Sequence, residues 1–227
     1  SITKLILNTG AAVIISVLLN ELIFLKLKKV FQTIVYIPHL MSWVVAASIF
    51  SMILSPTSAG LVNDVLMKLH LITDNIYFLG DQKWWRFSYY IINVWKDTGW
   101  GTIIFMATLA GISPELYEAA SMDGANRFQK MIYITLPALN NTIVTVLVLN
   151  LAKVMNLFES VFVLQNDAVI KVSDVLQTYI YTQTFNSGAI PDYGYTTAVG
   201  MFSSIISCIL VLVCNRVSHK TRGRGIV

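Results

Sequence analysis

The chain has 227 residues, of which 56% are hydrophobic and only 12% are charged. Soluble domains carry about 25% charged residues, and the mean hydropathy here is +0.67. The net charge of +4 is too small to indicate nucleic-acid binding. These values exclude an ordinary soluble domain. They predict an all-α, polytopic membrane protein that is a single transmembrane domain over residues 1–227.

Five apolar stretches are each about as long as the roughly 20 residues that cross a bilayer as a helix. They cover residues 5–25, 34–54, 88–112, 138–158 and 195–217. The sequence therefore predicts five spans, joined by short or structured connections.

Basic residues predict how these spans are oriented. A short loop after the first span holds Lys26, Lys28 and Lys29, and the tail holds Arg216, Lys220, Arg222 and Arg224. The positive-inside rule places both in the cytoplasm. The segment 111–137 and the C-terminus are then cytoplasmic, and segments 55–87 and 159–194 are outside. Because this arrangement starts outside with an odd number of spans, we expect one further helix before Ser1.

The segment 111–137 is a polar, charged insert between two apolar spans. Ser113 followed by Pro114 is typical of a helix start, since serine can cap and proline is tolerated at the first helical position. Glu118 would complement the positive end of the helix dipole. Ala119 and the next alanine favour helix and add little bulk.

A glycine turn ends this first helix. Asp123-Gly124 breaks it, because glycine accepts the left-handed conformation that a sharp turn needs. We expect a second short helix over residues 126–134, before Pro137 opens the next span. Small alanines and carboxylates on a cytoplasmic helix suit docking of another protein, although an amphipathic loop on the lipid headgroups fits the same pattern.

Polar and aromatic residues in the third predicted span are candidates for a substrate path, because polar groups within a membrane are costly. Trp95, Asp97 and Trp100 offer rings for stacking and a carboxylate for hydroxyl groups. In the alternative interpretation, Lys96 and Asp97 satisfy each other or a neighbouring helix, and the tryptophans anchor at the interface. Tyr179, in a short helix predicted over 172–185, is a weaker candidate.

The sequence contains no constellation that predicts catalysis. It lacks the phosphate-binding Gly-x-x-x-x-Gly-Lys-Ser/Thr loop and the His-Glu-x-x-His zinc motif. His39, His70 and His219 are scattered, and a packed or interfacial role for His39 is favoured over a ligand role. We therefore expect a protein that is not itself an enzyme, with no catalytic residues, no metal site and no cofactor bound by this chain.

The insert resembles the EAA loop of permease subunits from binding-protein-dependent ABC importers. Glu118-Ala119-Ala120 is followed after three residues by Gly124, and nine residues later by Ile134-x-Leu136-Pro137. Other stretches resemble the carbohydrate branch, in particular the complex-oligosaccharide subfamily related to the larger maltose-importer permease. These are Leu19-Asn20-Glu21, Tyr36-Ile37-Pro38-His39, Ser42-Trp43-Val44-Val45 and Trp95-Lys96-Asp97-x-Gly99-Trp100-Gly101-Thr102.

The resemblance implies a type I ABC importer permease fold with six core helices, of which the first precedes this chain. The EAA helix is then the coupling helix, seated on a cytoplasmic ATP-binding subunit. By the same resemblance, Glu118 and Asp123 make polar contacts, Ala119 and Ala120 allow close packing, and Gly124 makes the turn. ATP-driven closure of two such subunits would switch the permease from inward-open to outward-open.

The resemblance also extends the substrate path and names partners. Asn156, Phe158 and Glu159 fall where the sugar site lies in maltose-type relatives, although amides also hydrogen-bond between membrane helices. The implied partners are a second, different permease subunit, two ATPase subunits that bind ATP and Mg²⁺, and an extracellular binding protein. The setting is a prokaryotic plasma membrane. An amino acid, a peptide or a phosphonate is the alternative cargo to an oligosaccharide, and a membrane enzyme or scaffold is a third hypothesis.

Overall fold

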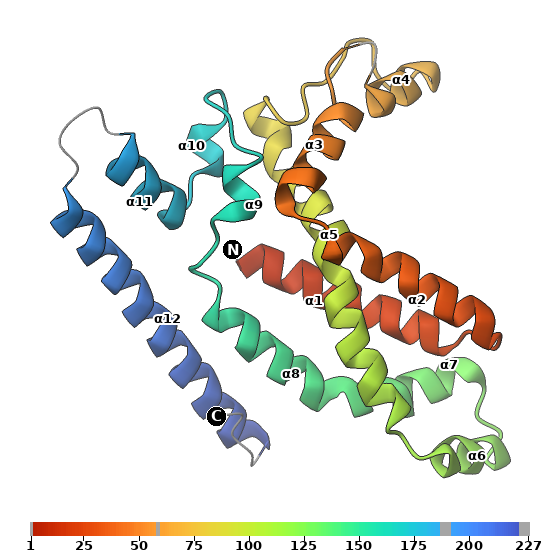
Figure 1. The fold of residues 1–227 in the computed structure, drawn as a ribbon. Coiled ribbons are helices and arrows are strands. Elements are labelled where there is room, and N and C mark those ends of the chain that lie inside the picture. The colour runs from red at the N-terminus through yellow and green to blue at the C-terminus, as the bar shows by residue number, and fades with distance from the viewer. Residues whose placement is uncertain (1, 58–59, 187–191, 223–227) are drawn as a thin grey trace. The chain divides into compact units, whose positions relative to one another are not determined.

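The computed structural model of the chain describes residues 2–57, 60–186 and 192–222, and the regular elements within these ranges are helices (Figure 1). The predicted all-α class is therefore confirmed for this part of the chain. Contacts divide it into two compact units, which are described separately. The first unit holds Met41–Lys96 and Ala152–Leu210, and the second holds Ile2–Leu40, Asp97–Leu151 and the chain from Val211 onward.

The second unit is built on helices α1 (Ile2–Asn20), α2 (Leu25–Leu40) and α8 (Leu136–Ala152), with the C-terminal part of α5 (Gln82–Ala110). Helices α1 and α2 run side by side (Figure 1). An apolar cluster from α1, α5 and α8 forms its core, with Ala12, Val17, Phe105, Leu109, Leu139 and Val146. The same unit carries α6 (Pro114–Met122) and α7 (Arg127–Lys130), which hold the polar insert.

Two glycines of α5 let its neighbours in this unit approach closely. A Cβ added at Gly99 would lie 2.4 Å from the Val35 carbonyl oxygen and 2.8 Å from the Tyr36 Cα of α2. A Cβ added at Gly101 would lie 2.8 Å from the Ala12 Cβ of α1. Small residues allow such close backbone contact between membrane helices. The Gly-Trp-Gly sequence therefore fixes how α1 and α2 pack on α5.

The first unit contains α3 (Trp43–Ile53), α4 (Leu61–Lys68), α9 (Glu159–Phe162), α10 (Ile170–Ser173) and α11 (Leu176–Phe185). It also contains the N-terminal part of α5 and most of α12 (Tyr193–Arg222). Its core combines Trp43, Ala47, Leu79, Trp85, Tyr89, Ile92, Val161, Leu164 and Val169. The helix predicted over 172–185 is two helices here, because the chain is extended at Asp174 and Val175.

Three helices in the described part are long and apolar enough to cross a bilayer: Ile2–Asn20, Arg127–Ala152 and Tyr193–Arg216. They correspond to the first, fourth and fifth predicted spans. The helix of the fourth predicted span ends at Ala152, however, so the prediction that it reaches residue 158 was wrong. It also begins earlier, because α7, a π-helical turn at Met131–Thr135 and α8 follow one another without a break.

The second predicted span, 34–54, is not one straight helix. It is divided between α2 and α3, two helices that are separated by a short break in the helical backbone. The break has a local cause, since the Ser42 side chain accepts a hydrogen bond from the Val45 amide and so caps a new helix start. The hydropathy of the stretch conceals this cap. Counted as one span, the pair gives four candidates in the described residues.

The third predicted span coincides with α5, whose 29 residues would extend about 44 Å. The helix is long enough to cross, but it is not among those apolar enough by composition alone. Lys26, Lys28 and Lys29 also differ from the prediction, because they lie within α2 and not in a loop. The side chains of Lys220, Arg222 and Arg224 in the predicted basic tail lie outside the described residues.

Candidate coupling loop and substrate path

Helix α6 carries the Glu118-Ala119-Ala120 sequence. It starts with Pro114 at its first position, as predicted, but the Ser113 side chain makes no capping hydrogen bond. The predicted serine cap is therefore absent. Proline still accounts for the start, because its ring presets the helical φ angle and the amide it lacks would have had no partner there.

The glycine turn that ends α6 explains the spacing of the motif. Gly124 has a φ of 78°, a left-handed value. The Gly124 amide donates to the Ser121 carbonyl at 3.1 Å, and the Ala125 amide donates to the Ala120 carbonyl at 2.9 Å. These two bonds make a Schellman motif, in which the residue after the helix end is left-handed and is usually a glycine. The distance from Glu-Ala-Ala to the glycine is therefore set by local backbone geometry.

The predicted coupling residues lie together on α6 and its turn. Glu118, Ala119, Asp123 and Gly124 are exposed, and Ala120 is half-buried. Helix α6 has no buried residue at all. The loop therefore presents a small, carboxylate-bearing surface that the rest of its unit leaves uncovered.

Beyond the turn, a reciprocal cap starts α7. The Asn126 side chain accepts from the Gln129 amide at 2.9 Å, and the Gln129 side chain accepts from the Asn126 amide at 2.8 Å. This capping box satisfies two amides that a helix start would otherwise leave unpaired. The predicted second helix of the insert is thus present, and it continues directly into α8.

Several predicted substrate-path residues belong to the first unit and adjoin an aromatic cluster. We use this name for Phe158, Phe162, Tyr181 and Phe185. The Phe158 and Phe162 rings stack with centroids 5.0 Å apart, and Tyr181 lies 5.5 Å from Phe158 and 5.2 Å from Phe185. Such rings offer flat apolar faces to a ligand or to a neighbouring helix. The cluster brings the chain before α9 against α11.

Polar groups flank this cluster. Asn156 is exposed and its side-chain oxygen accepts from the Gln177 amide at 3.3 Å. The Tyr179 hydroxyl lies 3.3 Å from that of Tyr195, and this hydrogen bond is the main reason that the pKa of Tyr179 is raised above its ordinary value. Glu159 is exposed at the first position of α9, where the helix dipole favours a carboxylate.

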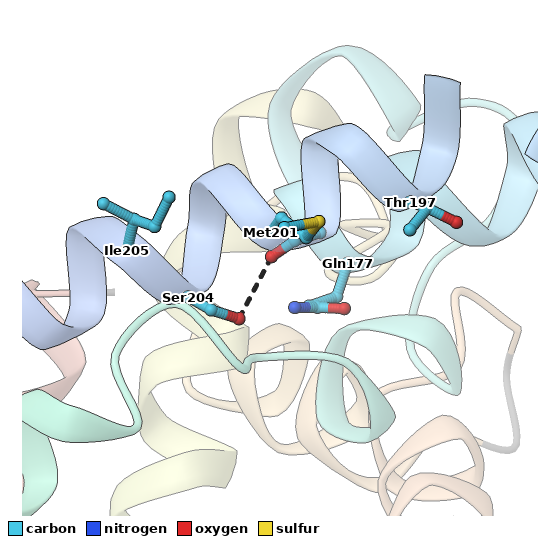
Figure 2. A pocket seen from close by; sticks show the side chains of 6 residues that line it. Gln177, Thr197, Met201, Ser204 and Ile205 are labelled. Carbon is cyan, nitrogen blue, oxygen red and sulfur yellow. Dashed lines mark hydrogen bonds between the residues drawn. The ribbon is translucent and has the colours of Figure 1, made fainter. Parts of the chain in front are cut away.

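A shallow open groove of about 560 Å³ lies between α11 and the N-terminal part of α12. Figure 2 shows that Gln177 reaches it from α11, and that Thr197, Met201, Ser204 and Ile205 line it from α12. The Ser204 hydroxyl is occupied by a bond to the Gly200 carbonyl at 3.1 Å. Gln177 is thus the residue that joins Asn156 to this groove.

The remaining predicted path residues have different surroundings. The Trp95 ring meets Phe50 edge-on at 5.1 Å within the first unit. In the second unit, Asp97 pairs with Lys4 at 3.4 Å and lies 3.9 Å from the His39 ring nitrogen. His39 stacks on Trp100 at 5.6 Å. The Asp97 carboxylate therefore already ties α5 to α1 and α2.

One alternative from the sequence was that Lys96 and Asp97 pair with each other. In the structure they do not. Lys96 is only 5% exposed, and its ammonium lies 4.9 Å from the centre of the Trp43 ring. Neighbouring residues of a helix point about 100° apart, so the two charges find different partners. The other part of that alternative, pairing with a neighbouring helix, is what Asp97 does.

Sequence reasoning missed Gln177 and Lys4. Gln177 precedes Tyr181 by four positions, so its place on the same helix face as the aromatic cluster was available from the spacing. Lys4 is 93 positions before Asp97 in the sequence. Lys4 lies just before the first predicted span, 5–25, but the structure places it inside the apolar helix α1, where a lone charge calls for a partner.

Comparison with known proteins identifies the family. Residues 12–223 match the family described as the binding-protein-dependent transport system inner membrane component. The chain belongs to this family. The predicted membership of the permease family is thereby confirmed.

Individual relatives agree with this result. Protein LplB of Bacillus subtilis (strain 168) is 39% identical over 217 residues, which cover 95% of this chain and 66% of LplB. The polygalacturonan/rhamnogalacturonan transport system permease protein YteP of the same organism is 38% identical over 215 residues, which cover 94% of this chain and 65% of YteP. The chain thus spans slightly less than two thirds of the length of these two curated relatives.

A solved structure is similar over almost the whole chain. It is the crystal structure of a bacterial alginate ABC transporter in complex with an alginate pentasaccharide-bound periplasmic protein. The TM-score is 0.91 at 33% sequence identity, and the match covers 98% of this chain and 76% of the other. The predicted permease fold is therefore confirmed.

Proposed function

We propose that the chain is a membrane permease subunit of an ATP-driven importer, and that it translocates an oligosaccharide delivered by an extracellular binding protein. It acts by alternating access around a central path. ATP and Mg²⁺ are bound and ATP is hydrolysed on separate subunits, so this chain is not catalytic. The observation that carries the proposal is the coupling loop, a Glu-Ala-Ala helix with no buried residue that ends at a glycine turn.

In this proposal α6 is the contact with the ATPase. Glu118 and Asp123 supply charge, Ala119 and Ala120 allow a close approach, and Gly124 sets the angle of the turn. The exposure of Glu118, Ala119, Asp123 and Gly124 supports this role, because a helix that buried these residues in its own unit could not offer them to a partner. Residues 111–137 are the cytoplasmic coupling loop of a single transmembrane domain.

An oligosaccharide is the cargo that the relatives favour. YteP is named for polygalacturonan and rhamnogalacturonan transport, and the similar solved structure is that of an alginate transporter. The aromatic cluster and its polar neighbours Asn156, Glu159 and Tyr179 offer ring faces and hydrogen-bonding groups that suit a sugar. Trp95 of the first unit, and Asp97 and Trp100 of the second unit, are further proposed path residues, and the Asp97 carboxylate is held by its ion pair with Lys4.

The proposed assembly contains a second, different permease subunit, two ATP-binding subunits and the extracellular binding protein. It lies in a prokaryotic plasma membrane, with the coupling loop and the C-terminus in the cytoplasm. The positive-inside rule supports this orientation.

The test combines co-purification with uptake. The chain is expressed with its partner subunits, and Glu118→Arg and Gly124→Leu variants are compared with the wild type for retention of the ATPase and for ATP-driven uptake of labelled oligosaccharides. We expect both variants to lose the ATPase and the uptake. Unaltered ATP-coupled uptake in both would contradict the coupling role, and uptake of amino acids, peptides or phosphonates instead of sugars would establish the alternative cargo.

A further inference from the structure

Four residues connect α6 to the start of α8 by hydrogen bonds that together form a closed ring. The Tyr117 and Thr135 hydroxyls are 3.0 Å apart, and the Thr135 hydroxyl reaches the Lys130 carbonyl at 3.5 Å. The Lys130 ammonium donates to the Ser121 hydroxyl at 2.5 Å, which donates to the Tyr117 carbonyl at 2.6 Å. We call Tyr117, Ser121, Lys130 and Thr135 the polar clasp.

The direction of each bond in the polar clasp is determined by its partners. A carbonyl can only accept, so the Thr135 proton goes to the Lys130 carbonyl and the Tyr117 hydroxyl donates to Thr135. The Lys130 ammonium can only donate, so the Ser121 hydroxyl accepts from it and uses its own proton for the Tyr117 carbonyl. Every group in the clasp thus has a compatible partner, and one bond is charge-assisted.

The polar clasp compensates for packing that α6 lacks. A helix of nine residues with no buried residue has little apolar contact to hold its angle. The only covalent connection between α6 and α7 is the short turn around Gly124. Thr135, in contrast, is fully buried at 0% exposure. The clasp therefore anchors an exposed helix to a buried point of the same unit.

The anchor point is a π-helical turn, Met131–Thr135, inside a helix that runs from Arg127 to Ala152. Single π-helical turns inside α-helices recur at functional sites. Because no break separates this turn from α8, a displacement of α6 that the clasp transmits would reach the apolar helix directly.

We propose that the polar clasp makes α6 and the helix from Arg127 onward move as one body, so that Tyr117 and Thr135 are positioning residues for energy coupling. This inference rests on the proposed coupling role of α6. It adds a specific requirement, namely that the hydroxyl bond between Tyr117 and Thr135 is needed for movement of α6 to drive transport, but not for docking of the ATPase.

The experiment uses the complete transporter, with its partner subunits and binding protein, in lipid vesicles. Labelled rhamnogalacturonan and alginate oligosaccharides are the probes, and the amount of sugar imported per ATP hydrolysed is measured. We expect Tyr117→Phe and Thr135→Val each to lower this ratio about fivefold, the factor that corresponds to one net hydrogen bond. The double variant should fall no further, because both single changes break the same bond.

Tyr133→Phe is the matched control, since it makes the same tyrosine-to-phenylalanine change within the π-helical turn that holds Thr135, at a residue that is 75% exposed. It should couple as the wild type does. A wild-type ratio in Tyr117→Phe and Thr135→Val would overturn the inference, and so would loss of the ATPase from these variants, because the bond would then serve docking. A wild-type complex that retains no ATPase would instead contradict the proposed function itself.

Discussion

The coupling loop and the core of the first unit are held in shape by opposite means. In the core, Trp85 and Tyr89 are 3% and 4% exposed, stack at 5.1 Å, and bury their polar atoms against Leu164 and Ser160. In the loop, α6 has no buried residue and depends on the glycine turn and the polar clasp. Substitutions in the core should therefore reduce the amount of folded protein, and substitutions in the loop should alter coupling in protein that remains folded.

The largest effect is expected at Trp85. Replacing it with alanine removes a buried ring and the donor to the Leu164 carbonyl at 3.1 Å, which should destabilise the fold by about 3–5 kcal/mol. Thermal unfolding in detergent would measure this loss. Trp84→Ala is the control, because the neighbouring ring is 38% exposed. An equal loss in both variants would mean that burial does not distinguish the two positions.

A second effect concerns a polar tie within the apolar second unit. Asp97→Asn should break the ion pair with Lys4. The Asp97 side chain is 25% exposed and the Lys4 side chain is 22% exposed. Breaking a fully buried ion pair lowers the free energy of unfolding by about 3–5 kcal/mol. Because this pair is partly exposed, we expect a decrease of about 2 kcal/mol. The interaction energy of the pair is measured by unfolding the two single variants, Asp97→Asn and Lys4→Met, and the double variant. Strictly additive losses would contradict a direct interaction.

The glycine turn should show a smaller loss of stability but a clear loss of function. Gly124→Val places a β-branched residue at a φ of 78°, at a cost of about 1–2 kcal/mol. No neighbour lies within 4 Å of an added Cβ, so the cost arises in the backbone alone. Co-purification of the ATPase should fall about tenfold.

Gly124→Asn is the companion variant, since asparagine tolerates the left-handed conformation better than most residues. It should retain most of the ATPase. If the valine and asparagine variants behave alike, the backbone explanation is wrong.

The smallest effect is expected at Tyr179, whose pKa is raised mainly by the bond with Tyr195. A raised pKa means that the bond stabilises the folded chain below the ordinary tyrosine pKa of about 10, and that this contribution is lost as the pH rises through the folded value. The melting temperatures of the wild type and Tyr179→Phe should therefore differ by a small, constant amount at neutral pH and converge in strong alkali. A difference that grows with pH would contradict the assignment.

The sequence was most informative where geometry is local. Asp123-Gly124 predicts the end of α6, because a Schellman turn involves only residues that are close together in the sequence. Hydropathy located the apolar stretches but missed the break at Ser42, since a cap depends on one side chain and not on average composition. Lys26, Lys28 and Lys29 were predicted to lie in a loop because they interrupt the apolar stretches, but they lie within α2.

Long-range partners could not be predicted. Nothing near Asp97 indicates that Lys4 would reach it, or that Lys96 would turn toward Trp43, because both pairings depend on how distant helices pack. The aromatic cluster and the hydrogen bond between Gln177 and Asn156 depend on the fold of the chain between α8 and α12. The roles of Asn156, Phe158 and Tyr179 in a sugar path stay predictions, although the structure now gives each a defined neighbour.

Cross-linking from α6 would test the central claim most directly. Met122 is 89% exposed at the end of α6, and Leu71 is 67% exposed in the segment 55–87, which the positive-inside rule predicts to lie outside. Single cysteines at the two positions, in a chain without Cys208 and Cys214, are treated with a short cross-linker in the assembled transporter. We predict a cross-link to an ATP-binding subunit from Met122→Cys and none from Leu71→Cys. A cross-link from Leu71→Cys alone, or none from Met122→Cys in an assembled complex, would contradict the account.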